Sequence, residues 1–469
     1  MKRFVYIWSI AFLFLGCENN KQSQKKQNKS KPNIVVILID DAGYADFGFM
    51  GSKELETPNI DKLAKSGVVF TDAHTSSNVC APSRAGLISG KYQQRFGFEC
   101  NGTGDKKSGE IGLVKDVTTI ADAFKQNDYK TIALGKWHLG SLEDDYPYNR
   151  GFDEFYGFLG GSRSYFPIKN PTRKQMLQKN GERVVFDGYL TDVLTDRATV
   201  FMEENKGNPF FMYMAYNAVH TPMQAKKEDL KKFEGHPRQM LAAMTWSLDE
   251  NVGKLVSKLE TLGVLENTLI FFLSDNGGAT TNNSDNGLLK GFKGNHYEGG
   301  HRVPFFLSWN GKVDGNKTFD GLTSSLDIFK TSIAAANIIE NESWGLDGAN
   351  LLSYVAGEQQ GEPHDQLFWR KGASGAARIG DNKLVYHDEY GGVLYNLSAD
   401  LGETTDLSKT KAQTFRKINE AYRQWEADKV TPLWMEKQFW QNRDFEIHRN
   451  LMQNKFRTAQ EMYQFEKNK

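Results

Sequence analysis

The sequence predicts an α/β fold, in which a large, mostly parallel sheet is sandwiched by helices and a small antiparallel sheet subdomain lies near the C-terminus. Three observations predict it. Continuous apolar runs alternate with segments of helical periodicity, each run stops abruptly at polar residues, and the C-terminal part changes to an alternation of period two. Continuous β-branched or aromatic runs are typical of strands buried on both faces of a parallel sheet.

Four apolar runs are interpreted as strands of the large sheet, namely residues 33–39, 130–134, 209–216 and 268–273. Helical spacing or a capping start predicts helices at residues 57–64, 119–126 and 241–259. In open α/β sheets, ligands bind beyond the carboxyl ends of the strands. The polar residues that follow the four runs are therefore expected to form one site from distant parts of the chain.

The predicted catalytic α/β domain spans residues 32–350, and a C-terminal α+β subdomain with a tail spans residues 351–469. Within the subdomain, residues 376–386 read as a half-buried strand with a turn. Residues 391–397 are the expected partner of that strand, and a helix is expected to accompany the small sheet.

Charge is balanced over the whole chain, with 58 Lys and Arg against 58 Asp and Glu in 469 residues. Such a chain gives no general argument for binding nucleic acid, and none is expected. An anionic ligand must therefore be held by local charge.

Residues 1–17 are interpreted as a lipoprotein-type signal peptide, because a basic start and an apolar stretch precede Gly16 and Cys17. Cys17 would become a lipid-anchored N-terminus, and residues 18–31 would form a flexible tether. The alternative is a simple signal peptide that leaves a soluble protein. We expect export to the periplasm, or an outer-membrane lipoprotein, in a Gram-negative bacterium.

The chain has three cysteines, so no structural disulfide framework is expected. A disulfide between Cys80 and Cys100 is the alternative.

Acidic and amide side chains follow two of the predicted strands. Asp40 and Asp41 come directly after the first run, and Asp275 and Asn276 follow the run at 268–273. Three carboxylates packed together would repel one another, and a hard divalent cation removes that repulsion. Oxygen ligation without His or Cys favours calcium or magnesium. The alternative for each residue alone is a helix cap or a turn.

Basic side chains are also found in turn or glycine-rich segments near the predicted strand ends, namely Arg84, Lys136, His138, His220 and Lys293. Taken singly, each is an ordinary surface residue. If all of them converge near the metal, they form a strong anion pocket.

The run Cys80-Ala81-Pro82-Ser83-Arg84, followed by Gly90, resembles the Cys-x-Pro-Ser-Arg signature of type I sulfatases. Further landmarks of that family match in order: Asp40-Asp41, Gly135-Lys136-Trp137-His138, His220-Thr221-Pro222, Ser274-Asp275-Asn276-Gly277, residues 294–304, and Leu394-Tyr395-Asn396-Leu397. The resemblance covers about residues 32–410. Ile88-Ser89 and Phe292 depart from the commoner pattern.

The resemblance implies an alkaline phosphatase-like fold and a bacterial lipoprotein-type carbohydrate sulfatase. In that family the cysteine matching Cys80 is converted to formylglycine (3-oxoalanine) by a formylglycine-generating or radical maturase. One Ca²⁺ per chain would be held by Asp40, Asp41, residue 80, Asp275 and Asn276. A hydroxyl of the hydrated aldehyde, bound to calcium, would attack sulfur.

The same resemblance assigns roles to the basic residues. Arg84, Lys136 and Lys293 would neutralise the sulfate oxygens. His220 would protonate the leaving alcohol, and His138 would help deprotonate the second hydroxyl, which then expels sulfate.

The expected function is hydrolysis of sulfate monoesters, on O-sulfate groups of polysaccharide-derived sugars. Alternatives are an arylsulfatase acting on small phenolic sulfates, a phosphoester hydrolase, and an inactive glycan-binding lipoprotein. Candidate contacts to a sulfated saccharide are Arg163, His301, Arg302 and Trp309. Core packing beside residues 305–307 is an equal alternative for Trp309.

Overall fold

A computed structural model describes residue 1 and residues 31–101 and 112–468 of the chain. The predicted signal peptide and tether fall almost entirely on residues 2–30, which lie outside the described residues. Among the described helices, none combines the length and the apolar character needed to cross a membrane. Residues 31–469 form one compact unit.

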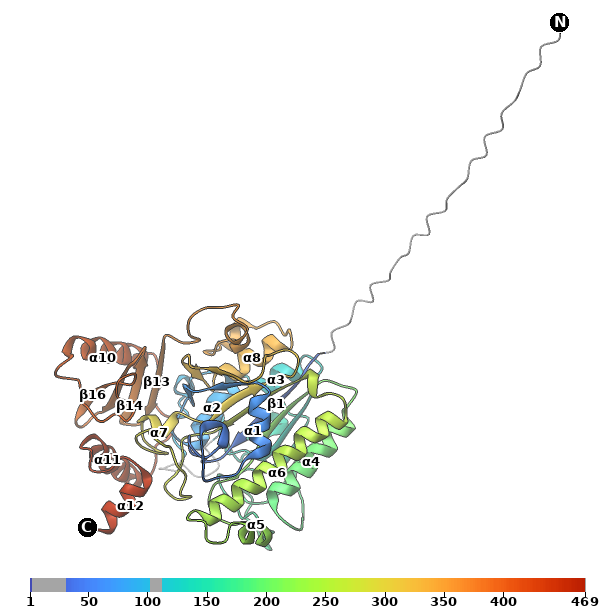
Figure 1. The fold of residues 1–469 in the computed structure, drawn as a ribbon, viewed down its shortest axis with the longest axis horizontal. Coiled ribbons are helices and arrows are strands. Elements are labelled where there is room, and N and C mark those ends of the chain that lie inside the picture. Colours follow the sequence, from blue (N-terminus) through green and yellow to red (C-terminus); the bar gives the residue numbers. More distant parts are fainter. Residues whose placement is uncertain (2–30, 102–111, 469) are drawn as a thin grey trace. The chain divides into compact units, whose positions relative to one another are not determined.

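The core of this unit is a ten-stranded mixed sheet (Figure 1). In sheet order, its strands are β11 (Lys317–Phe319), β2 (Val68–Phe70), β10 (Phe305–Ser308), β9 (Thr268–Ser274), β1 (Asn33–Ile39), β8 (Phe210–Ala215), β4 (Lys130–Lys136), β5 (Glu154–Phe158), β6 (Gln178–Lys179) and β7 (Glu182–Arg183). The five central strands from β9 to β5 are parallel. The predicted large, mostly parallel sheet is confirmed.

Helices cover both faces of the sheet. The even-numbered residues of β1, Ile34 to Leu38, pack in one buried cluster, and the odd-numbered ones, Val35 to Ile39, pack in another. The first cluster contains residues of α2 (Cys80–Ser89), α3 (Ile120–Lys125) and α8 (Asp327–Ala335). The second contains residues of α1 (Pro58–Lys65), α4 (Leu190–Glu204) and α6 (Gln239–Thr261). Because both faces are covered, the strand sequences are continuously apolar rather than alternating.

The central strands end level with one another. Ile39 of β1 pairs with Ser274 of β9, and Ala215 of β8 pairs with Leu38 and with Gly135 of β4. The polar residues that follow these strands are therefore delivered to one edge of the sheet, as the sequence predicted.

The C-terminal part contains the expected small antiparallel sheet, with strands β13 (Gln366–Lys371), β14 (Ser374–Ile379), β15 (Asn382–His387) and β16 (Gly391–Asn396). Helix α10 (Ala412–Ala427) packs on it through Ile418 and Tyr422. Helices α11 (Gln438–Met452) and α12 (Ala459–Lys467) share a second buried cluster with β15, β16 and Phe292. Strand β13 is an addition to the predicted strands. The fold also contains the short helices α5 (Lys227–Lys232), α7 (Glu298–His301) and α9 (Leu351–Val355). A separate two-stranded sheet pairs β3 (Ala73–His74) with β12 (Thr323–Ser324).

The tail beyond α10 returns to the catalytic side of the unit. Trp434 packs edge to face on Phe98, and its indole N–H donates to the Cys100 carbonyl at 3.0 Å. The tail thus supports the segment that leads to Asn101.

Candidate active site

Three buried carboxylates meet at the carboxyl edge of the sheet. Asp40 and Asp41 follow β1, and Asp275 follows β9; none is more than 1% exposed. Asn276 donates from Nδ2 to Asp41 Oδ1 at 2.8 Å, which joins the two strand ends. The predicted gathering of these residues is therefore what the structure shows.

Asp41 adopts a left-handed backbone conformation, with φ of 66°. A non-glycine residue takes this conformation only where its surroundings enforce it. Asn282 Nδ2 and Ser284 Oγ both donate to the Asp41 carbonyl at 2.9 Å. These two residues were missed in the sequence, where a polar loop gives no signal beyond a turn.

The cationic side chains lie directly against the carboxylates. Lys136 Nζ is 2.6 Å from Asp40 Oδ2, and Lys293 Nζ is 2.6 Å from Asp41 Oδ1. Arg84, fully buried in α2, donates from Nε to Asp275 Oδ2 at 2.8 Å. The structure thus brings these three cations together at the strand ends, where each faces a carboxylate.

Burial and neighbouring charges shift the pKa values of these carboxyl groups. Burial would raise the pKa of Asp40, but Lys136, His220 and Arg84 hold it well below its ordinary value. Burial and the neighbouring Asp40 instead raise the pKa of Asp275, against the effect of Arg84. The buried carboxyl groups therefore differ in pKa, although each of them faces one cation.

Cys80 is the first residue of α2 and is 1% exposed. Its Sγ lies 3.6 Å from Asp40 Oδ1 and 3.0 Å from Lys293 Nζ. Burial and the nearby Asp275 raise the pKa of the thiol to about 12. The unmodified thiol is consequently a poor nucleophile at neutral pH. Cys80 and Cys100 are both free, so the alternative disulfide does not form in this structure.

The two histidines flank this cluster. His220 has its Nδ1 within 2.6 Å of the Thr221 carbonyl, so Nδ1 carries a hydrogen and Nε2 remains available for proton exchange, 3.6 Å from Asp41 Oδ2. His138 has a left-handed backbone with φ of 61°. Burial, Lys136 and Arg84 lower its pKa well below the ordinary value, so it is neutral and can accept a proton.

The residues fit a hard divalent cation. Four potential ligand atoms lie within 4.8 Å of one another: a carboxylate oxygen each from Asp40 and Asp41, the Cys80 sulfur and a His220 ring nitrogen. The Oδ1 atom of Asn276 is buried and has no hydrogen-bond partner among the described residues. An unpartnered buried carbonyl oxygen beside three carboxylates is the donor set that calcium prefers.

A pocket adjoins the nucleophile position and is lined by Ala81, Asn101, His138, Gly161 and Lys174, among others. Asn101 Oδ1 accepts the Ala81 N–H at 2.8 Å, which fixes the first turn of α2. A Cβ atom on Gly161 would lie 2.6 Å from His138 Nε2, so glycine is required there. No sequence motif marks these residues, because their roles depend on neighbours that are distant in the chain.

Two of the four candidate substrate residues are occupied elsewhere. His301 is 0% exposed, and its ring stacks on Trp369 with centroids 4.1 Å apart. Arg302 pairs with Asp72 at 3.0 Å and with Glu298 at 3.2 Å. The structure does not bring either to the Cys80 pocket, because the small sheet covers this segment.

Trp309 follows β10, which runs antiparallel to β9, so Phe305 pairs with Leu273 and Ser308 pairs with Ile270. Trp309 therefore lies toward the amino end of β9, away from Asp275, and belongs to a buried apolar cluster. This agrees with the core-packing alternative. Arg163 lies on the segment after β5 and lines a separate pocket.

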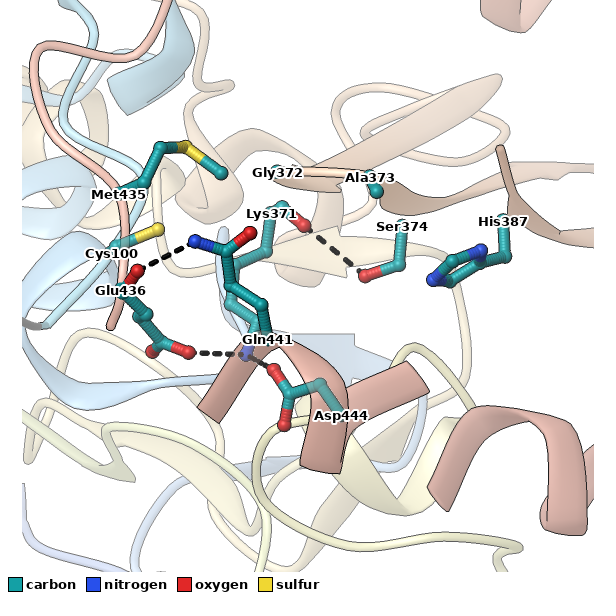
Figure 2. Close-up of a pocket in the computed structure, with 10 residues that line it drawn as sticks. All are labelled: Cys100, Lys371, Gly372, Ala373, Ser374, His387, Met435, Glu436, Gln441 and Asp444. Carbon is teal, nitrogen blue, oxygen red and sulfur yellow. Dashed lines mark hydrogen bonds and ion pairs between the residues drawn. The ribbon is translucent and has the colours of Figure 1, made fainter. Parts of the chain in front are cut away.

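Another pocket lies between Cys100, the β13–β14 turn and α11 (Figure 2). Its lysine, Lys371, is paired with Asp444 and lies 3.6 Å from Glu436. Its one lysine is thus already held by carboxylates, and none of the predicted catalytic residues lines the pocket.

The fold and the site together place three buried carboxylates, three cations and Cys80 at the carboxyl edge of a mostly parallel sheet, an arrangement typical of enzymes that hydrolyse anionic esters. Comparison with known proteins identifies the family. The sulfatase family model matches residues 32–338, and the chain belongs to the sulfatase family, as a type I sulfatase of the alkaline phosphatase superfamily. It is a sulfuric ester hydrolase.

Three relatives illustrate the match. The chain is 32% identical to the uncharacterized sulfatase YdeN of Escherichia coli over 73% of this chain and 69% of that protein. It is 30% identical to human N-acetylgalactosamine-6-sulfatase over 76% of this chain and 71% of that protein. A crystal structure of Ps i-CgsB superposes with a TM-score of 0.82 at 36% identity, over 89% of this chain and 97% of that one.

Proposed function

We propose that the protein hydrolyses O-sulfate monoesters on polysaccharide-derived sugars, with a formylglycine hydrate at residue 80 as nucleophile and one Ca²⁺ in the site. The position of Cys80 carries this proposal. Residue 80 lies between Asp40, Asp41 and Lys293 at the start of α2, yet its thiol scarcely ionises. A hydrated aldehyde at the same position offers a hydroxyl nucleophile and a second hydroxyl for release of sulfate.

The sulfate ester would bind among Arg84, Lys136 and Lys293, whose charges converge on residue 80. These cations neutralise the sulfate oxygens as negative charge shifts onto the leaving oxygen. Calcium held by Asp40, Asp41, Asp275, Asn276 and residue 80 would supply Lewis-acid chemistry, by lowering the pKa of a hydroxyl group.

The proposed reaction has two covalent steps. One hydroxyl of residue 80 loses its proton to water, and its oxygen bonds to sulfur while the bond from sulfur to the sugar oxygen breaks. Protonated His220 gives its Nε2 proton to that sugar oxygen and later regains a proton from water. The remaining hydroxyl of residue 80 then loses its proton to neutral His138, the carbon–oxygen bond to sulfate breaks, and the aldehyde re-forms. Water adds to the aldehyde and restores the hydrate. The positions of His220 near Asp41 and of His138 beside the pocket support these roles.

A sugar substrate is supported by the relatives. Ps i-CgsB has also been crystallised with k-i-k-neocarrahexaose, and that complex superposes on this chain with a TM-score of 0.82. Human N-acetylgalactosamine-6-sulfatase is named for a sulfated amino sugar. An arylsulfatase acting on small phenolic sulfates is the second candidate, since Arylsulfatase G of Homo sapiens is 28% identical.

The test is sulfate release from a panel of sulfated mono- and oligosaccharides, with a small aryl sulfate as comparison. Turnover of saccharides above the aryl sulfate supports the proposal, whereas turnover of the aryl sulfate alone contradicts the sugar assignment. The mass of a proteolytic peptide containing residue 80, taken from active enzyme, should show the aldehyde or its hydrate. Finding only unmodified cysteine in active enzyme contradicts the nucleophile.

Calcium is tested by chelation. Removal of divalent cations should abolish sulfate release, and added Ca²⁺ should restore it with a rise in thermal stability, because binding to the folded state alone stabilises it. An enzyme that keeps full activity after exhaustive chelation has no such requirement.

We also propose that the protein is exported as a lipoprotein anchored through Cys17 to a Gram-negative membrane, after a formylglycine-generating or radical maturase has acted on Cys80. The basic and apolar N-terminal residues ending in Gly16-Cys17 support this. Fractionation of the native cell should find the protein with membranes, and Cys17→Ser should move it to the soluble fraction. Unchanged membrane association would contradict the anchor.

A further inference from the structure

Six arginines of the described residues are buried, and five of them pair with a carboxylate or donate to several backbone carbonyls. Arg84, Arg238, Arg370 and Arg378 each pair with at least one carboxylate. Arg150 instead donates to three backbone carbonyls, those of Leu113, Val114 and Val117, at 2.7 to 3.1 Å. This is how the fold normally accommodates a buried guanidinium group.

Arg163 departs from that pattern. It is 3% exposed, and within the described residues its guanidinium group has no carboxylate within ion-pair distance. Its one hydrogen bond goes from Nε to the carbonyl of the adjacent Ser164 at 3.0 Å, and Nη1 is buried without a partner. Burial lowers its pKa to about 10, a value still well above neutrality, so the group remains charged. A buried charge without a partner is costly to the folded state.

The surroundings of Arg163 form a site rather than a packing defect. The guanidinium carbon lies over the rings of Phe158 at 5.9 Å and Phe186 at 5.2 Å, which hold it in one orientation. The pocket that Arg163 lines contains a second arginine, Arg183, and no carboxylate among its lining residues. Its other walls, such as Pro167 and Val185, are apolar. Two arginines among apolar walls suit an anionic group carried on a ring with C–H faces.

The pocket is also close to the catalytic centre along the chain. Arg163 follows Gly161 by two residues, at most about 7 Å of extended backbone. A Cβ atom on Gly161 would touch His138, and Gly161 lines the pocket beside the nucleophile. The segment after β5 therefore lines both pockets.

We propose that Arg163 binds a second anionic substituent, a sulfate ester or a carboxylate, on the saccharide whose sulfate is hydrolysed at residue 80. This inference rests on the proposed function. It makes the enzyme selective for sugars or oligosaccharides with at least two anionic groups, and it assigns Arg163 to substrate specificity rather than to the chemical step.

The experiment compares wild-type enzyme with Arg163→Gln on three matched saccharides: one with a single sulfate, one with two sulfates, and one with a sulfate and a uronic acid carboxylate. Because a hydrogen-bonded charge pair is lost, kcat/KM for one or both doubly anionic substrates should fall about 10- to 100-fold, mainly through KM. The singly sulfated substrate should change less than about threefold. The two doubly anionic substrates distinguish sulfate from carboxylate recognition.

Thermal stability separates recognition from a structural role. Arg163→Gln removes an unpaired buried charge, so Tm should stay equal or rise, whereas Arg150→Gln, the matched buried arginine with its partners, should lower Tm. In a Cys80→Ala background, calorimetry should show weaker binding of a doubly anionic saccharide when Arg163 is replaced. A lower Tm together with equal losses on all three substrates would overturn the proposal, as would unchanged selectivity. Absence of turnover on every saccharide by wild-type enzyme would instead refute the proposed function.

Discussion

Two buried clusters hold the same kinds of side chain but balance their charge differently. The Cys80 cluster comprises Asp40, Asp41, Cys80 and Lys293 with their neighbours at the carboxyl edge of the large sheet. The His301 cluster comprises His74, Glu298, His301 and Lys383, between α7 and the small sheet. Each places at least three potential metal-ligating atoms within 4.8 Å of one another.

In the His301 cluster, the ammonium group of Lys383 lies where a metal ion would otherwise balance the carboxylates. Lys383 Nζ lies 2.7 Å from Glu298 Oε1, 3.1 Å from His301 Nε2 and 3.3 Å from Glu403 Oε1. In the Cys80 cluster, each of the three carboxylates is paired with one cation, the Asn276 Oδ1 atom has no hydrogen-bond partner among the described residues, and a pocket opens beside Ala81. The kinds of residue alone therefore do not make a functional site, and the pocket that adjoins the Cys80 cluster distinguishes it from the His301 cluster.

The largest expected effect is a loss of sulfate release when the Cys80 cluster is altered. Cys80→Ala should lower sulfate release at least about 1,000-fold, because the nucleophile is lost. Its Tm should stay within a few degrees of wild type. Cys100→Ala, which removes the other buried free thiol, is the control and should keep wild-type turnover in the same assay. Substantial activity in Cys80→Ala would remove residue 80 from the mechanism.

The next prediction tests how much the charge pairs of the His301 cluster contribute to the stability of the folded protein. Lys383→Met removes the buried cation beside Glu403 and leaves Glu298 with Arg302 alone, and it should lower the free energy of unfolding by about 3–5 kcal/mol. Denaturant unfolding measures this directly. Addition of Ca²⁺ or Zn²⁺ should not stabilise the wild-type His301 cluster, since the lysine already compensates it. A neutral Lys383→Met substitution would show that this charge network is not required by the fold.

A smaller effect tests the geometry beside the catalytic histidine. Gly161→Ala places a methyl group 2.6 Å from the position of His138 Nε2, so the ring must move. We expect kcat/KM to fall by about 10- to 100-fold, because small displacements of a catalytic group are costly. Gly207→Ala, where an added Cβ meets nothing within 4 Å, should leave kinetics unchanged. Equal kinetics for both variants would exclude a catalytic position for His138.

The smallest effect is a pH dependence that belongs to the His301 cluster. Burial and Glu298 raise the pKa of Glu403 to about 7, against the effect of Lys383. The folded state thus holds this proton more tightly than the unfolded chain. The resulting stabilisation is full below about pH 4.5 and is lost as the pH rises toward 7. Glu403→Gln should flatten the stability profile over this window, whereas exposed Glu358→Gln should not.

Much of this comparison could be predicted from the sequence, and the missing parts have physical reasons. The runs 33–39 and 268–273 were read as strands because burial on both faces makes them continuously apolar, and the strand ends then placed Asp40 and Asp275 together. His301 and Arg302 were expected near substrate because the chain beside them matched a family motif. Their partners Lys383 and Asp72 come from distant segments, which no local pattern reveals.

The same limit applies to the residues that were missed. Asn101 and Gly161 act through a single contact each, to Ala81 and to His138, and a lone Asn or Gly carries no signal in the sequence. Arg163 was predicted as a substrate residue, but its distinguishing property, a buried charge without a partner, is visible only in three dimensions.

The contact of the tail with the catalytic side has a consequence for the order of events during synthesis. Trp434 supports the Cys100 carbonyl, and the next residue, Asn101, holds the first turn of α2. A chain synthesised from its N-terminus contains residue 80 before Trp434 exists. During that interval the start of α2 lacks this support, whereas in the folded chain residue 80 is 1% exposed. The last part of the chain to be made thus completes the support of the helix that begins at residue 80.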